Sequence, residues 1–169
     1  MKQLSNWGFN QASWKGEHGE YWVLVQGLLM LGYILLPVYR PDGLAIEPPL
    51  LYGVWGLSAL LFGLASIFLI KGVMDLGANL TPLPYPKPDA QLVQTGIYQI
   101  VRHPLYTGVT LAAKAYAIGQ LSLSHFAAML VLFVFFNFKA DREEQWLSQR
   151  FVDYPHYRQQ VKKLIPWLF

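Results

Sequence analysis

The chain has 169 residues, of which 54% are hydrophobic and only 14% are charged. Soluble domains usually carry about 25% charged residues, so this composition argues against a soluble domain. A net charge of +3 is too small to indicate nucleic-acid binding, and the lack of cysteine excludes disulfides, thiolate metal sites and a nucleophilic thiol. The length fits one domain over residues 1–169.

The N-terminal half contains two apolar runs that predict transmembrane helices. Residues 1–20 are mixed and polar and do not have the pattern of a secretory signal. The first run covers residues 21–39, and the second, residues 50–70, contains no charge. Each is about as long as a helix that crosses the hydrocarbon core. In the second run Ala59 and Gly63 are four positions apart, which favours close packing against another helix.

A polar stretch, residues 71–103, separates these runs from two further ones. It carries four prolines at every second position from 82 to 88, a spacing that forbids a helix there. The third run, residues 104–119, and the fourth, residues 125–138, are joined by a short link and predict a helical hairpin. The fourth helix is expected to continue into the charged segment that follows.

The distribution of basic residues predicts the orientation. With four spans, every Lys and Arg except Arg40 and Lys114 lies on the side of the two termini and the Pro-rich loop. Basic residues favour the cytoplasmic side. We therefore predict an all-α integral membrane fold of four transmembrane helices, or five if the N-terminal segment enters the membrane. Residues 1–70 would supply N-terminal helices, and residues 71–169 a core with a cytoplasmic cofactor site formed by the Pro-rich loop and the C-terminal helices.

The residues around Pro104 could carry chemistry. Pro104 suits the first position of a helix, whose free N–H groups can face an anion. Tyr98 and Tyr106 offer ring faces that attract a cation. A snorkelling Arg102 among interface aromatics would explain the same residues equally well. Lys114, in the middle of a span, is expected to be structural.

The order of the motifs resembles one family. The segments are L-V-x-x-G-x-Y at 92–98, R-H-P-x-Y-x-G at 102–108, an apolar hairpin, Glu143-Glu144, then Phe151, Tyr154 and Tyr157, and a terminal Ile165-Pro166. This order resembles the isoprenylcysteine carboxyl methyltransferase family, its prokaryotic members and the related phospholipid methyltransferases. The resemblance covers residues 76–167. No G-x-G-x-x-G element is present, so a nucleotide-like cofactor would not sit on a Rossmann turn.

The resemblance implies S-adenosyl-L-methionine as cofactor, no metal, and a set of site residues. Gln91, Leu92 and Val93 would line the adenosine region. The methionine part would be surrounded by Tyr98, Arg102, His103, Pro104 and Tyr106, and Glu143 would hold its amino group. Lys139 stands where relatives commonly carry an Arg near a substrate carboxylate, and Glu144 could accompany an acceptor amine. The catalytic candidates are therefore Lys139, Glu143 and Glu144.

The implied reaction is methyl transfer to a membrane lipid or isoprenylated acceptor in a prokaryotic inner membrane, with the active site facing the cytoplasm. Three departures put the acceptor in doubt: Lys139, the absence of glycine after Phe151, and Lys163 where an Arg is usual. Phospholipid (ethanolamine) N-methylation, a membrane reductase of the sterol-reductase type and a non-enzymatic scaffold stay open as alternatives. Nothing in the sequence specifies an oligomeric state.

Overall fold

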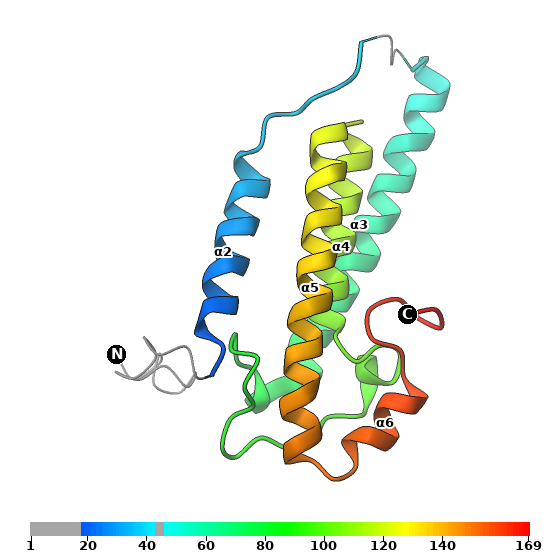
Figure 1. Ribbon diagram of the computed structural model, residues 1–169. Helices are drawn as coiled ribbons and strands as arrows, with labels where there is room; N and C mark the ends of the chain where they lie inside the picture. Colours follow the sequence, from blue (N-terminus) through cyan, green and yellow to red (C-terminus); the bar gives the residue numbers. More distant parts are fainter. Residues whose placement is uncertain (1–17, 43–45) are drawn as a thin grey trace.

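Four long helices lie side by side along one axis in the computed structural model, which describes residues 18–42 and 46–169 (Figure 1). They are α2 (Glu20–Leu35), α3 (Pro48–Leu76), α4 (Pro104–Gly119) and α5 (Leu123–Arg150). A short helix, α6 (Tyr154–Gln160), lies with the loop after α3 and the C-terminal segment at one end of the bundle (Figure 1). No β-strand occurs in the described ranges, so the predicted helical fold is confirmed there.

The helix starts follow from the local sequence. α3 opens with Pro48 and Pro49, and α4 opens with Pro104. Proline fits the first turn, where its missing N–H has no helical partner to lose. α5 follows the N-cap Ser122, whose side-chain oxygen accepts a hydrogen bond from the backbone N–H of His125 at 3.3 Å. The predicted start of the third run and the continuation of the fourth beyond residue 138 are both confirmed.

Two helix ends differ from the sequence prediction. α2 ends at Leu35 instead of residue 39, because the proline at 37 restricts the residue before it to extended conformations. α3 continues to Leu76, six residues beyond the predicted end of the second run at residue 70. The first proline of that stretch, at 82, is too far along to stop the helix, which ends at Gly77 with a positive φ of 53°. The Pro-rich segment itself is irregular, as predicted.

α3 and α4 pack closely through small residues. A Cβ atom on Gly108 of α4 would lie 2.7 Å from Cγ of Leu69 and 3.1 Å from the backbone oxygen of Ala65, both on α3. Ala65 is 1% exposed. The prediction that Ala59 and Gly63 make the close helix contact was wrong within this chain: both are exposed, and a Cβ on Gly63 would meet nothing within 4 Å.

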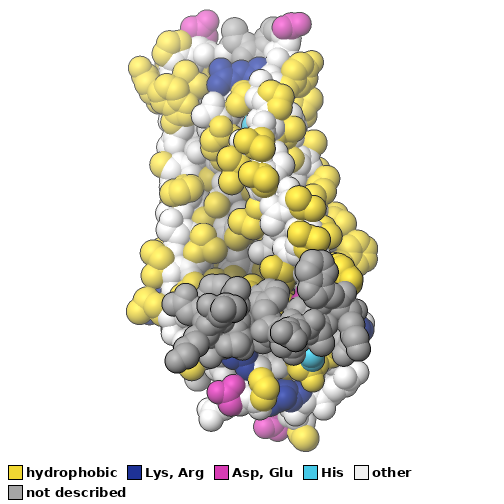
Figure 2. All heavy atoms as spheres, turned by 90° about the vertical axis from the view of Figure 1, so that its left-hand side faces the viewer, with side chains coloured by type: hydrophobic (Ala, Val, Ile, Leu, Met, Phe, Trp, Pro, Cys, Tyr) yellow, Lys and Arg dark blue, Asp and Glu magenta, His cyan; other side chains and the backbone are white. Residues whose placement is uncertain are grey.

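The length and surface of the helices fit a membrane. Two segments, Pro48–Asn79 and Leu123–Arg150, are long and apolar enough to cross a bilayer by length and composition. Only 11% of the apolar window of the first is buried inside the molecule, so its apolar surface needs cover from outside. α2 and α4 have 16 residues each, which makes them shorter, at roughly 24 Å. Figure 2 shows charged side chains gathered towards the two ends, with hydrophobic side chains over the shaft between them.

The sequence predicts four spans, or five if the N-terminal segment enters the membrane. In the described residues, two helices meet the length and composition of a membrane span. Residues 1–17 lie outside the described part of the chain, as do residues 43–45.

Candidate active site

A cavity of about 350 Å³ opens where the Pro-rich loop, the start of α4, the charged part of α5 and α6 meet. This volume lies within the range of about 300–1,000 Å³ that is typical of small-molecule sites. Every residue that the sequence analysis proposed for the cofactor lines this cavity, and so does Lys139. These residues are Gln91, Leu92, Val93, Tyr98, Arg102, His103, Pro104, Tyr106, Lys139 and Glu143. The remaining candidate, Glu144, is not on the cavity wall.

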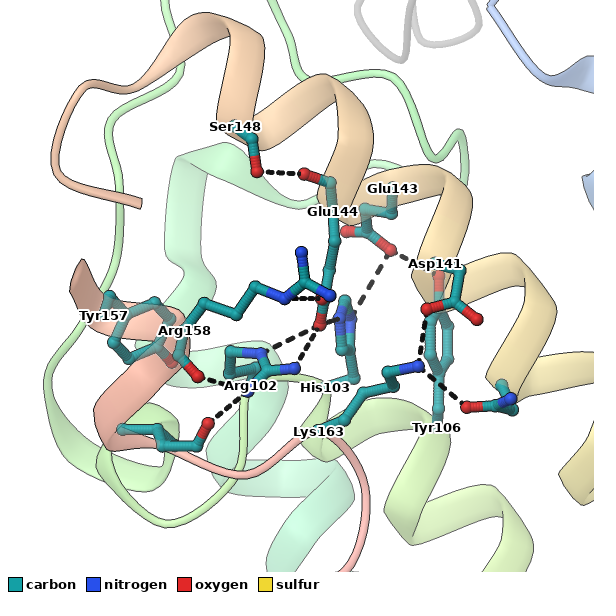
Figure 3. Close-up of polar contacts among 12 residues, drawn as sticks. Arg102, His103, Tyr106, Asp141, Glu143, Glu144, Ser148, Tyr157, Arg158 and Lys163 are labelled. Carbon is teal, nitrogen blue, oxygen red and sulfur yellow. Dashed lines mark hydrogen bonds and ion pairs between the residues drawn. The ribbon is translucent and has the colours of Figure 1, made fainter. Parts of the chain in front are cut away.

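Glu144 is the centre of a buried ion cluster. Its Oε1 atom lies 2.8 Å from both Nε and Nη2 of Arg102 and 3.1 Å from Nε2 of His103. Its Oε2 atom lies 3.2 Å from Nε of Arg158 on α6. Glu144 is 1% exposed, so several basic groups compensate one buried carboxylate. Figure 3 shows these side chains converging from three segments: the loop before α4, α5 and α6.

Glu143, one position earlier, faces the cavity. Its Oε2 atom accepts a hydrogen bond from the hydroxyl of Tyr106 at 2.8 Å and lies 3.6 Å from Nδ1 of His103. The His103 ring therefore lies between two carboxylates (Figure 3). It also stacks on the ring of Tyr106, with centroids 5.3 Å apart and planes 5° apart. The structure thus brings together His103 and Glu143, which are 40 positions apart in the chain.

Lys139 lies one helical turn before Glu143 on α5, and its hydrogen-bond partners are neutral. Its Nζ atom donates to Oε1 of Gln26 on α2 at 2.5 Å and to the backbone oxygen of Pro82 at 3.3 Å. Nζ also lies 5.3 Å from the centroid of the Tyr106 ring, within the range of a cation–π contact. The residue is 1% exposed, and no carboxylate of the described residues is within ion-pair distance of Nζ. A buried ammonium with this environment attracts an anion.

The C-terminal segment covers the Arg102-His103 pair. Backbone N–H groups of these two residues donate to the carbonyls of Lys162 at 2.9 Å and Lys163 at 3.2 Å. Further along the segment, the Leu164 carbonyl accepts from the hydroxyl of Thr107 at 2.7 Å. These bonds fix the end of the chain over the start of α4.

The Pro-rich loop is held at both of its ends. At its start, the amide oxygen of Asn79 accepts from the backbone N–H of Gln91 at 2.9 Å. At its end, Oδ2 of Asp75 accepts from the backbone N–H of Ile97 at 2.8 Å. Gly96 between them has a φ of 60°, and a Cβ there would lie 2.1 Å from Oδ2 of Asp75, so only glycine fits. The segment that carries Gln91, Leu92 and Val93 is therefore positioned by α3 and by the 3-10 turn Gly77–Asn79 that follows it.

Three polar side chains are notable among the cavity residues that the predicted site did not include. Gln26 of α2 binds Lys139, and the only available signal was a polar amide inside an apolar run. Tyr157 donates from its hydroxyl to the carbonyl of Tyr98 at 2.5 Å. Tyr154 is buried, and its hydroxyl has no hydrogen-bond partner among the described residues. Burial raises the pKa of the Tyr154 hydroxyl, which keeps it protonated and able to donate. Both tyrosines belong to the motif order that resembles the family, but the resemblance gave neither of them a role.

A family comparison agrees with this arrangement. The sequence model of the phospholipid methyltransferase family matches residues 54–153, more than half of the chain. The chain belongs to the phospholipid methyltransferase family. The matched range includes the Pro-rich loop, the start of α4 and the two glutamates. Membership points to methyl transfer to a lipid-like substrate, and the apolar helices agree with a membrane protein of this family.

A second similarity is weaker. The chain is 25% identical over 145 residues to 3-oxo-5-alpha-steroid 4-dehydrogenase 1 of Macaca fascicularis. The alignment covers 85% of this chain and 50% of the relative, so the chain spans about half the length of that protein.

Proposed function

We propose that this member of the phospholipid methyltransferase family transfers the methyl group of S-adenosyl-L-methionine to an anionic lipid-like acceptor, in the manner of isoprenylcysteine carboxyl methyltransferases. The observation that carries the proposal is one cavity whose wall holds both a carboxylate and an ammonium group. Glu143 supplies a carboxylate that suits a cationic ligand, and Lys139 supplies a buried ammonium with no ion pair among the described residues.

The cavity residues fit the cofactor's chemical groups. The Glu143 carboxylate, held by the Tyr106 hydroxyl, suits an ammonium group. The stacked faces of His103 and Tyr106 suit a sulfonium, because an aromatic face attracts a cation. Leu92 and Val93 offer apolar wall for a purine, and the unpaired hydroxyl of Tyr154 offers a donor for a ribose or carboxylate oxygen. Bound there, the cofactor would supply an activated methyl group.

The contribution of the protein would be binding, alignment and exclusion of water. Displacement at a sulfonium needs no covalent nucleophile, so the absence of cysteine is no obstacle. Glu144 would act through its contacts: it fixes Arg102 and His103, and His103 supports the Tyr106 ring. Lys139 would hold the acceptor's anionic group facing the methyl donor. Alignment of two bound reactants can supply several orders of magnitude in rate.

A phospholipid (ethanolamine) N-methyltransferase is the second candidate, and membership of the matched family is equally compatible with it. The phosphate of a phospholipid acceptor would lie beside Lys139, and its amine would have to lie in the neutral form near Glu143. A reductase is a third candidate, because the dehydrogenase relative covers most of this chain. Binding of a nicotinamide cofactor in place of S-adenosyl-L-methionine would identify a reductase, and binding of neither would identify a scaffold.

The test combines cofactor binding with product analysis. Purified protein should bind radiolabelled S-adenosyl-L-methionine and transfer label to a lipid extract. Base-labile label in the product indicates a methyl ester, and base-stable label on an amine headgroup indicates phospholipid N-methylation. Absence of binding and of transfer would overturn the proposal.

Lys139→Met and Lys114→Met provide a matched pair. Lys139 is buried on the cavity wall, whereas Lys114 is exposed on α4 about ten positions from the cavity residues at its start. Lys139→Met should raise the acceptor KM by roughly tenfold or more, the worth of one charge-assisted hydrogen bond. Lys114→Met should leave transfer near normal. An unchanged KM in Lys139→Met would remove the anionic acceptor from the proposal.

A further inference from the structure

A second cavity, of about 290 Å³, lies between α2, α4 and α5. Its wall is largely apolar and includes Met30 and Ile34 of α2, Ala112 of α4 and Leu132 of α5. Val109 of α4 lines both this cavity and the candidate active site, so the two meet at one side chain. The second cavity therefore adjoins the candidate active site on the side of the helical bundle.

His125 contributes an imidazole to the wall of this second cavity. It is 1% exposed, and its Nδ1 atom lies 2.8 Å from the hydroxyl oxygen of Ser122. The rings of Tyr33 and Tyr116 flank it with centroids at 5.0 and 4.9 Å. The hydroxyl of Tyr33 already donates to the backbone oxygen of Ala113. Nε2 of His125 has no hydrogen-bond partner among the residues that the structure describes, and an unmet polar atom at a buried position favours a ligand oxygen.

The spacing along α5 sets the length of such a ligand. Lys139 and His125 are fourteen positions apart on this helix, which corresponds to about 21 Å of rise. α2 is held to the hairpin at two places, by Gln26 on Lys139 and by Tyr33 on Ala113. Between these contacts its Met30 and Ile34 side chains line the second cavity. An anionic molecule held at Lys139 with an extended apolar body would thus reach His125.

We infer that the second cavity receives the apolar body of the methyl acceptor and that Nε2 of His125 hydrogen-bonds an oxygen at the acceptor's far end. The inference rests on the proposed function, because it takes the acceptor's anionic group to lie at Lys139. The ligand class is a long anionic lipid with a hydroxyl or carbonyl oxygen remote from its head. A lipid without that oxygen would leave Nε2 unpaired.

Two fatty acids serve as probes of matched length: hexadecanoic acid and 16-hydroxyhexadecanoic acid. Each is titrated against the purified full chain in detergent, by competition with radiolabelled hexadecanoic acid. We expect the hydroxy acid to bind about tenfold more tightly, as one additional buried hydrogen bond would produce. Equal affinities in the unaltered protein would overturn the role of His125, because water would then satisfy Nε2 equally well. Failure of both acids to bind would overturn the inference that the second cavity receives the acceptor's apolar body.

Single-residue variants test whether the preference for the hydroxy acid arises at His125. His125→Phe keeps a ring between Tyr33 and Tyr116 and should abolish the preference for the hydroxy acid while retaining hexadecanoic acid binding. His156→Phe, at an exposed position of α6, is the matched control and should keep the preference. Met30→Phe fills the cavity from α2 and should weaken both acids at least tenfold, which provides a test should His125→Phe not fold. A preference that survives in His125→Phe, or full binding in Met30→Phe, contradicts the inference.

The same preparations are titrated with radiolabelled S-adenosyl-L-methionine. Loss of cofactor binding with intact fatty-acid preference would contradict the proposed function alone. Intact cofactor binding with no preference for the hydroxy acid would contradict the role of His125 alone.

Discussion

Glu143 and Glu144 are adjacent in the chain but have different surroundings. Successive residues of a helix point about 100° apart, so only one of them can face the cavity. Glu143 lies on the cavity wall and accepts from Tyr106, whereas Glu144 is enclosed by Arg102, His103 and Arg158. The first is thus placed to meet a ligand, and the second to hold the groups that do.

We predict that Glu143→Gln weakens the affinity for S-adenosyl-L-methionine by roughly ten- to a hundredfold, because the ligand's ammonium loses a charge-assisted partner. The fold should stay intact, since the amide still accepts from the Tyr106 hydroxyl. Isothermal titration of the purified protein measures the effect, with far-ultraviolet circular dichroism as the check on folding. An unchanged dissociation constant in the folded variant would rule out Glu143 as a cofactor ligand.

His103→Ala should weaken the same binding step. Because His103 lies 3.6 Å from Glu143 and both groups would hold one ligand, we expect the double variant to lose less than the sum of the two single losses. Strict additivity in this four-protein cycle would show that the two residues act at separate places.

Glu144→Ala is predicted to act on stability. Removing one member of a buried ion pair leaves Arg102 without compensation, which typically costs about 3–5 kcal/mol. The Asp141–Lys163 pair is the comparison, because the Asp141 side chain is 41% exposed. Asp141→Ala should cost about 1 kcal/mol or less. Denaturant unfolding in detergent compares the two, and similar costs would argue against a structural role for Glu144.

Among the elements, the α3–α4 pair depends on small residues. Gly108→Ala places a methyl group 2.7 Å from Leu69, so we expect it to destabilise the protein by about 1–3 kcal/mol through overpacking. Gly63→Ala is the matched control, because its Cβ would meet nothing within 4 Å. It should be neutral or slightly stabilising. The unfolding free energies of both variants in detergent test this packing, and a tolerated Gly108→Ala would contradict it.

For the whole molecule, the basic residues predict that the Pro-rich loop and the C-terminus face the cytoplasm. In the structure, this loop, α6 and the C-terminal segment lie at the same end of the bundle (Figure 1). Reporter fusions at Lys87 and Phe169 should therefore both give cytoplasmic signals, and a fusion at Asp42 should give the opposite one. A signal from the opposite side at Lys87 or Phe169 would overturn the four-span topology.

The sequence determined the features that depend on neighbouring residues. Prolines placed the start of α4 and kept the loop around residues 82–88 irregular, and apolar runs located the long helices. The motif order pointed to ten of the residues that line the cavity, through resemblance to a family. The end of α3 was missed, because nothing before Gly77 in that segment stops a helix.

Only the tertiary structure decided which residues meet. Gln26 reaches Lys139 across 113 positions, and Arg102 reaches Glu144 across 42. The rotation of one helix against another decides three further features. It separates the surroundings of Glu143 from those of Glu144, it puts the close contact at Gly108 and not at Gly63, and it forms the cavity that His125 lines. Helix rotation is set by many side chains packing together across three or four elements, and the pattern along any one element does not contain it.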